Sequence, residues 1–174
     1  MNSKYTRFLV AFFLISLVAF SLTGCKEKQE KFPIEKASSV PEGLGVSIHS
    51  NITDEDLQMI TDAGFKWVRI DIFWERVETK KGHYDFKTSG YDKLNKKLKA
   101  HNIRPYYILD YSNSLYEKDR SIVTDEGRVA FSKFVKETTK RYKNQGVIWE
   151  IWNEPNIALF WENQPSYKDY ADLV

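Results

Sequence analysis

Residues 149–156 read WEIWNEPN, and this stretch decides how the chain is predicted to fold. The aromatic and β-branched residues over 147–153 are typical of a strand. Pro155 closes the strand, because its nitrogen has no hydrogen to donate to a neighbouring strand. Asn153 and Glu154 therefore stand where the strand ends, and the elements around them indicate which kind of sheet holds it.

Strand and helix patterns alternate along the rest of the chain. Apolar runs predict three earlier strands, over 43–49, 65–73 and 104–111, and a helical pattern follows each of the four strands. The first helix is predicted over 53–63, with Thr53 and Asp56 as a capping pair at its start and Gly64 as its stop. The second is centred on Tyr91, Leu94 and Leu98, and the fourth spans 166–174. The third contains a buried face made of Phe131, Phe134, Val135, Thr138 and Tyr142. Four such units in a row predict parallel strands covered by helices.

Polar residues recur at the ends of these strands, and they favour a barrel over a doubly wound sheet. They are His49, Asp71, Asp110 and Glu154. In a (β/α)₈ barrel this end of the strands carries the chemistry, and the glycine-rich turn of a nucleotide-binding sheet is absent after the first strand. The predicted fold class is α/β, the N-terminal half of a (β/α)₈ TIM barrel. Because such barrels take about 250 residues, we expect residues 43–174 to be the first part of a longer catalytic domain. A half barrel that is itself the natural product, acting in binding or assembly, is the alternative.

The first 42 residues are expected to target and tether the chain. Lys4 and Arg7 precede an apolar run of about fifteen residues that ends in Leu-Thr-Gly-Cys, which resembles the lipobox of bacterial lipoproteins. We expect residues 1–24 to be a signal peptide, Cys25 to be lipidated, and the charged segment 25–42 to be a flexible tether. The protein would then be extracytoplasmic and anchored to the cell membrane. A buried apolar helix that ends in LTGC by chance is the alternative.

Composition excludes some partners and favours others. The 26 Lys and Arg residues nearly balance the 24 Asp and Glu residues and are interleaved with them, so nucleic acid is not an expected partner. Aromatic residues make up 15% of the chain, and flat rings with a polar edge suit the recognition of sugars. His83 and His101 have no metal-ligand spacing, so neither a metal nor another cofactor is expected.

Three segments together resemble one enzyme class. Residues 67–86 (WVRIDIFWERVETKKGHYDF), 103–113 (IRPYYILDYSN) and 148–156 (IWEIWNEPN) look like the second, third and fourth strands of clan A glycoside hydrolases. The nearest likenesses are families 5 and 39 and the bacterial exopolysaccharide-cleaving enzymes related to them. The resemblance implies a retaining glycosidase that hydrolyses O-glycosidic bonds of a polysaccharide or oligosaccharide. A non-catalytic, carbohydrate-binding lipoprotein of the solute-receptor type is the rival hypothesis.

The resemblance also implies roles for single residues. Glu154 becomes the general acid and then the general base, and Asn153 holds the sugar hydroxyl beside the scissile bond. The family's nucleophile sits on the seventh strand, which these 174 residues do not include, and Arg69 would orient it. A general acid must first carry a proton to the leaving oxygen and can later take one from water.

Strand alternation adds further predictions around this motif. If Glu154 faces the barrel mouth, then Ile148, Glu150 and Trp152 share its face, whereas Trp149 and Ile151 face the helices. A carboxylate inside the barrel needs a cation, and Arg69 is the local one, with Asp71 two residues later on the same face. For Arg69 and Glu150, a structural salt bridge and a role on the substrate side both stay open.

The remaining candidates for sugar binding are polar or aromatic groups at strand ends. Asp71 and Asp110 are counted among them, and His49 either bonds a sugar hydroxyl or is a structural histidine. Three aromatic residues, Trp74, Tyr111 and Trp161, either stack on a sugar ring or are buried against neighbouring loops.

Overall fold

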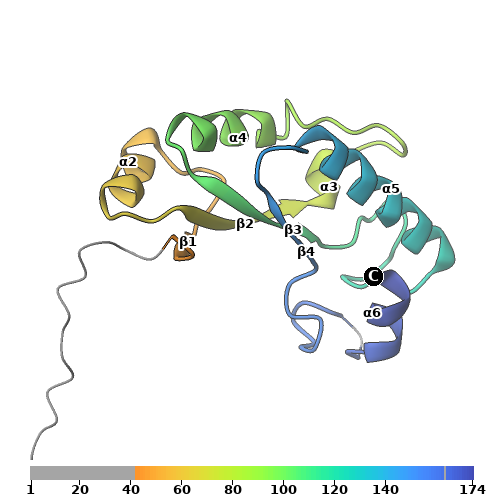
Figure 1. The fold of residues 1–174 in the computed structure, drawn as a ribbon. Helices are drawn as coiled ribbons and strands as arrows, with labels where there is room; N and C mark the ends of the chain where they lie inside the picture. Colours follow the sequence, from red (N-terminus) through yellow and green to blue (C-terminus); the bar gives the residue numbers. More distant parts are fainter. Residues whose placement is uncertain (1–41, 163) are drawn as a thin grey trace, which may run out of the picture. The chain divides into compact units, whose positions relative to one another are not determined.

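The structure, a computed structural model, describes residues 42–162 and 164–174. The predicted signal peptide, Cys25 and nearly all of the predicted tether lie outside these residues. The described part holds four strands and five helices (Figure 1): β1 (Gly45–Ser47), α2 (Asp54–Asp62), β2 (Trp67–Phe73), α3 (Trp74–Val77), α4 (Tyr91–Ala100), β3 (Arg104–Asp110), α5 (Asp125–Arg141), β4 (Ile148–Ile151) and α6 (Tyr167–Leu173). None of these helices is both long enough and apolar enough to cross a lipid bilayer.

All four strands form one parallel sheet in the order β1-β2-β3-β4. The sequence therefore predicted each strand and the parallel pairing correctly. The clearest differences from the prediction are in three elements. The first strand is shorter, since β1 spans Gly45–Ser47 and not 43–49. The short helix α3 follows β2 without a loop, and β4 ends at Ile151 instead of Asn153. The early end of β4 alters the geometry of the Asn-Glu-Pro motif.

Helix α2 begins where the capping pair predicts. The backbone N–H of Asp56 donates to Thr53 Oγ1 at 3.1 Å, and the backbone N–H of Thr53 donates to Asp56 Oδ2 at 3.0 Å. These two bonds satisfy donors that have no partner within the helix. Gly64, at φ +86°, turns the chain out of the helix and toward β2.

The core lies between the sheet and the helices that cover one of its faces. Helices α4 and α5 both lie over this face (Figure 1), and Arg141 at the end of α5 donates from Nε to Asp92 at the start of α4 at 2.6 Å. Fully or almost fully buried side chains fill the space beneath them: Val68, Ile70, Ile72, Leu94, Leu98, Tyr107, Leu109, Phe131 and Phe134. Because side chains alternate along a strand, the residues between them point to the opposite face. That face carries the polar groups of the candidate site.

The loop after β2 is fixed by one buried carboxylate, that of Glu78. It accepts hydrogen bonds from Trp74 Nε1, the Gly82 backbone N–H and the Tyr116 hydroxyl, each at 2.6 Å. Asn113 also donates from Nδ2 to the Glu78 carbonyl oxygen at 2.8 Å. Because Asn113 and Tyr116 follow β3, these bonds tie the loops after β2 and β3 to each other.

Candidate active site

Arg69 lies at the centre of the polar face of the sheet. Its Nε and Nη2 donate to Glu150 Oε2 at 3.0 and 2.8 Å, and Nη2 also donates to Asn153 Oδ1 at 2.9 Å. The guanidinium carbon stands 5.9 Å from the centre of the Tyr106 ring. The predicted pairing of Arg69 with Glu150 is therefore present, and the same arginine also holds Asn153. A structural salt bridge and a role on the substrate side are both compatible with this arrangement, because Arg69 bonds Glu150 and also Asn153, the predicted ligand of the sugar.

Asn153 reaches this face because the backbone leaves the strand geometry one residue earlier. Trp152 has φ +68° and Glu154 has φ +48°, both in the left-handed region that few residues other than glycine adopt. Trp152 turns away into the core, at 1% exposure. The prediction that Trp152 shares a face with Glu150 and Glu154 is therefore wrong. Simple alternation holds only as far as Ile151, where β4 ends.

The amide of Asn153 is held from both ends. Its Oδ1 accepts from Arg69, and its Nδ2 donates to the Tyr111 hydroxyl at 3.2 Å. Arg69 sets the orientation of this amide, because a guanidinium only donates and an exchange of oxygen and nitrogen would put an N–H against it, whereas the Tyr111 hydroxyl can donate or accept. Among the described residues the amide has no further partner, so one oxygen lone pair and one N–H of Asn153 are open to a ligand there. Tyr111 completes this arrangement from the loop after β3, and the sequence suggested it only as a stacking ring.

Glu154 and His49 are both exposed at strand ends. Glu154 stands two residues beyond the left-handed turn at Trp152, so its side chain is open to solvent and to a substrate. His49 follows β1, and its backbone carbonyl accepts from the Ile52 N–H at 3.1 Å. Within the described residues, no group of three or more His, Cys, Asp or Glu side chains comes together as a metal site would require.

Asp110 is completely buried, and both of its carboxyl oxygens lack a hydrogen-bond donor among the described residues. Burial, together with the neighbouring charge of Asp71, raises the pKa of Asp110 to about 9. A protonated Asp110 can donate to Asp71, whereas an ionised one would have no compensating partner. Because its oxygens are closed off, Asp110 is not placed to touch a sugar, contrary to its prediction as a binding residue. Asp71 is only half-buried and keeps that prediction.

Replacing Asp110 by asparagine is expected to stabilise the protein at neutral and alkaline pH. Folded Asp110 keeps its proton up to a pH of about 9, whereas an unfolded aspartate loses its proton near pH 4. The folded state thus binds more protons between these values, and the free energy of unfolding falls as the pH rises. Asparagine has the same shape and does not ionise. The ionisation lost on folding costs about 1.4 kcal/mol for each pH unit above the unfolded pKa, so we expect Asp110→Asn to raise the free energy of unfolding by up to about 5 kcal/mol at pH 8 and by much less at pH 4.

Urea unfolding at the two pH values measures this difference. Asp62→Asn, on the exposed surface of α2, is the matched control and should change little at either pH. A variant that is no more stable than the parent at pH 8 would contradict the assignment of a protonated Asp110.

Two predicted sugar-stacking rings are core residues instead. Trp74 is fully buried between Tyr116, whose ring centre is 5.2 Å away, and Phe134, at 6.0 Å. Trp161 is 1% exposed, and its ring centre lies 4.9 Å from that of Trp152. Neither ring presents a face to a ligand, so the stacking prediction is wrong for both. The alternative of burial against neighbouring loops is the one that the structure shows.

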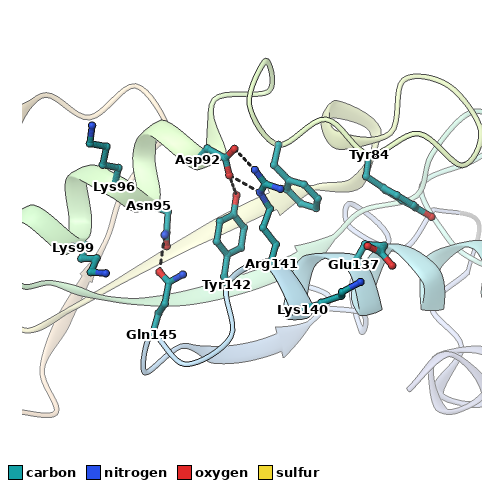
Figure 2. A pocket seen from close by; sticks show the side chains of 11 residues that line it. Tyr84, Asp92, Asn95, Lys96, Lys99, Glu137, Lys140, Arg141, Tyr142 and Gln145 are labelled. Atoms are coloured by element: carbon teal, nitrogen blue, oxygen red, sulfur yellow. Dashed lines mark hydrogen bonds and ion pairs between the residues drawn. The ribbon is translucent and has the colours of Figure 1, made fainter.

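A groove of about 760 Å³ lies elsewhere, between α4 and α5 on the helical side of the sheet. Figure 2 shows that its polar groups largely pair with one another: Asp92 with Arg141 and Tyr142, and Asn95 with Gln145 at 2.7 Å. The amino groups of Lys96, Lys99 and Lys140 stand apart along its rim. None of the predicted site residues lines this groove, so we do not assign the active site to it.

Comparison with known proteins finds related glycoside hydrolases. The family model for cellulase (glycosyl hydrolase family 5) matches residues 25–173. A phospho-cellobiase from Klebsiella oxytoca is 26% identical over 115 residues, which are 60% of this chain and 24% of that protein. An aryl-phospho-β-D-glucosidase from Bacillus subtilis strain 168 is 27% identical over 115 residues, with the same coverage. The chain therefore spans about a quarter of the length of these curated relatives.

Solved structures give the same answer for the fold. A family 39 glycoside hydrolase from the gut symbiont Bacteroides cellulosilyticus WH2 matches with a TM-score of 0.58 and 28% identity, over 64% of this chain and 24% of that one. A family 39 enzyme from Xanthomonas axonopodis pv. citri matches with a TM-score of 0.55 and 22% identity, over 75% of this chain and 30% of the other, and supports the fold alone.

The fold prediction is confirmed, since the four βα units are those of the N-terminal half of a glycoside hydrolase TIM barrel. The resemblance to clan A glycoside hydrolases, which the motifs around Arg69 and Glu154 suggested, is confirmed as well. By the match over residues 25–173, this chain belongs to the cellulase family, glycosyl hydrolase family 5.

Proposed function

We propose that the protein is a retaining glycosidase that cleaves β-linked O-glycosidic bonds in an oligosaccharide or polysaccharide, with Glu154 as its general acid and base. The observation that carries this proposal is the fixed amide of Asn153, held between Arg69 and the Tyr111 hydroxyl beside Glu154. A sugar hydroxyl bound by that amide would place its ring next to an exposed carboxyl group at the strand ends. Family membership and the names of the two curated relatives, both of which concern β-glucosides or cellobiose, support the bond type.

Glu154 acts twice in this mechanism. In the first step it gives its proton to the oxygen of the departing sugar, while a carboxylate nucleophile attacks the anomeric carbon and forms a glycosyl-enzyme. In the second step the ionised Glu154 takes a proton from water, and the hydroxide so formed displaces the enzyme carboxylate. Two inversions at the anomeric carbon leave the β configuration unchanged.

The nucleophile is proposed to be a carboxylate outside the residues that the structure describes. Glu150 accepts both short bonds from Arg69, and Asp110 is sealed from solvent, so neither is free to attack a sugar. Arg69 would help orient that incoming carboxylate, because its guanidinium already bonds Asn153 next to Glu154. Asp71 and His49 are proposed to bind further hydroxyl groups of the same sugar.

Location is proposed from the N-terminal residues. Removal of residues 1–24, lipidation of Cys25 and a tether over 25–42 would hold the barrel outside the cell, on the membrane through its lipid anchor. The basic residues Lys4 and Arg7, the apolar run after them and the LTGC motif support this proposal. A carbohydrate in the cell envelope or in the medium would then be the partner.

Product stereochemistry tests the proposed function. The full-length protein is mixed with aryl β-glucosides, cello-oligosaccharides and their 6-phosphorylated forms, and the first product is followed by proton NMR. We expect the β anomer to appear first and to mutarotate later. If the α anomer appears first, the mechanism is inverting and the retaining proposal is wrong. If sugars bind but none of them is cleaved, the carbohydrate-binding lipoprotein is the correct alternative.

A further inference from the structure

Basic and acidic residues nearly balance over the whole chain, but the fold gathers basic side chains on the outer side of α4 and of the second half of α5. Ten of them belong to these helices and to the residues that follow each helix: Lys93, Lys96, Lys97, Lys99, Arg104, Lys133, Lys136, Lys140, Arg141 and Lys143. All except Lys97 are exposed. This set is called the basic face.

Neighbouring carboxylates neutralise only part of the basic face. Five of them lie within it or beside it: Asp54, Glu55, Asp85, Asp92 and Glu137. Even with all five ionised, the ten cations leave an excess of five positive charges. Asp54 forms an ion pair with Lys97 and Asp92 forms one with Arg141, whereas the other eight cations form no ion pair within the described part of the chain.

Two hollows open on the basic face, and they share the lining residues Asn95, Lys99 and Gln145. The larger is the groove of Figure 2. The smaller, of about 130 Å³, lies between the end of α4 and the start of β3, and its lining contains Lys99 and Arg104 but no carboxylate. The Arg104 guanidinium carbon is 4.2 Å from the centre of the Trp67 ring, so this ring covers its flat side and leaves its N–H edge for an anion. The chemistry of this small cavity suits a phosphate group.

The spacing of several lysines opposes helix stability. Lys133 and Lys136 are three residues apart on α5, Lys136 and Lys140 are four apart, and so are Lys93 and Lys97 on α4. Like charges at these spacings repel each other across one side of a helix. A lysine in the last turn is favourable because it meets the negative end of the helix dipole, but Lys93, Lys133 and Lys136 lie outside the last turns. Helix stability therefore does not explain the basic face.

One edge of the basic face lies close to the residues through which the N-terminal segment enters the sheet. The Lys66 backbone N–H donates to the Leu44 carbonyl oxygen at 3.3 Å, and the Arg104 backbone N–H donates to the Lys66 carbonyl oxygen at 2.9 Å. Leu44 and Arg104 are therefore two strand spacings apart, about 10 Å, at the starts of parallel strands. Glu154 follows the opposite end of β4. A surface that binds near Arg104 would meet the strand starts and leave Glu154 on the other side.

We infer that the basic face docks on a lipid bilayer that contains anionic phospholipids, with the phosphate of one headgroup in the small cavity between Lys99 and Arg104. Headgroups offer a broad layer of negative charge, which matches cations spread over two helices better than a single small anion does. The same bilayer is the surface to which the proposed lipid anchor at Cys25 would bring the domain. Docking by this face would keep Glu154 clear of the headgroups and open to a glycan.

Lysine labelling on vesicles tests this docking. The full-length protein is mixed with vesicles of phosphatidylcholine, or of phosphatidylcholine with phosphatidylglycerol, and mass spectrometry follows the reaction of each lysine with an amine-selective reagent that does not cross membranes. We expect Lys96, Lys99 and Lys143 to react more slowly on the anionic vesicles. Lys80 and Lys118, exposed on the loops after β2 and β3, should react equally on both. If the protein stays in solution with neutral vesicles, the anchor proposal fails, and the fraction bound to anionic vesicles then measures docking.

Substitutions then assign the docking to the basic face. A cation near an anionic bilayer strengthens association about fivefold, so the triple variant Lys96→Gln, Lys99→Gln and Lys143→Gln should dock about a hundredfold more weakly. The matched control is Lys80→Gln, Lys118→Gln and Lys168→Gln, which removes the same charge from other exposed positions and should dock as the parent does. Arg104→Gln tests the cavity and should return the labelling of Lys99 to its rate on neutral vesicles.

Several results would overturn the inference. They are equal labelling on both kinds of vesicle, slower labelling of Lys80 and Lys118 to the same extent, and docking that survives in the triple variant of the basic face. Two further results would replace the bilayer by another partner: inorganic phosphate that protects Lys99 on neutral vesicles by itself, or tighter binding to a DNA duplex than to anionic vesicles. Circular dichroism shows whether each variant is folded. Since no bond is cleaved in these measurements, an incorrect role for Glu154 would appear in the hydrolysis assay and not here.

Discussion

Replacing Glu154 by glutamine is expected to lower kcat for cleavage of a β-linked disaccharide by about 10² to 10⁴-fold. Glutamine keeps the size and the hydrogen-bonding ability of the side chain but has no proton to give to the leaving oxygen. Since Glu154 is exposed and follows a turn that does not depend on its carboxyl group, the variant should fold like the parent. Hydrolysis rates and a thermal melt, measured side by side, separate lost chemistry from lost structure.

The choice of substrate shows whether the loss comes from proton transfer. A dinitrophenyl glycoside has a leaving group that departs without a proton, so its first step should be almost unaffected, and the glycosyl-enzyme should accumulate. Added azide attacks that intermediate without a general base, so it should restore turnover and yield a glycosyl azide. Glu55→Gln, on the exposed side of α2, is the control and should behave as the parent does. Equal losses for all leaving groups, with no effect of azide, would remove Glu154 from the acid and base roles.

Replacing Trp152 by alanine is expected to lower the free energy of unfolding by about 3–5 kcal/mol. The indole is 1% exposed and lies among three rings, with centre distances of 4.9 Å to Trp161, 5.3 Å to Tyr111 and 6.3 Å to Phe131. Its Nε1 also donates to the Phe160 carbonyl oxygen at 3.0 Å, and alanine would leave that oxygen without this donor. The cavity left behind would lie directly beneath Asn153 and Glu154.

Chemical unfolding measures this loss, and a second tryptophan provides the comparison. Trp67 is half-buried at the start of β2, with the Arg104 guanidinium carbon 4.2 Å from its ring centre. Trp67→Ala should cost about 1–2 kcal/mol, because much of that ring already touches solvent. If the two variants lose the same stability, then the packing around Trp152 is not what supports the turn.

The elements of the fold were predictable because each had a local signal. The capping pair of Thr53 and Asp56 gave the start of α2, and the spacing of Tyr91, Leu94 and Leu98 gave the buried side of α4. The pairing of Arg69 with Glu150 followed from alternation, since a carboxylate on the inner face of a sheet needs a cation on the next strands. These predictions depend on few residues and on regular geometry.

The site could be predicted only as far as that geometry stays regular. Beyond Ile151 the left-handed backbone at Trp152 sends the indole into the core and returns Asn153 to the side of Arg69. Burial of Trp74 and Trp161 depends on loops that come from distant parts of the chain, such as the one that brings Tyr116 over Trp74. The contacts of Arg76, in α3, with the Phe73 ring and of Arg120, on a loop, with the Tyr111 ring had no signal in the sequence, because each is defined only by the ring that the guanidinium covers.

The buried carboxylate of Glu78 bears on how this face of the protein meets a glycan. Its donors are an indole, a backbone amide and a phenol, all neutral, and they come from α3 and from the loops after β2 and β3. The conformational entropy of these loops is thus lost when the chain folds and not when a sugar arrives. An incoming glycan would meet walls that are already in place, so its affinity would depend on complementarity of shape and charge, with little cost for ordering the protein.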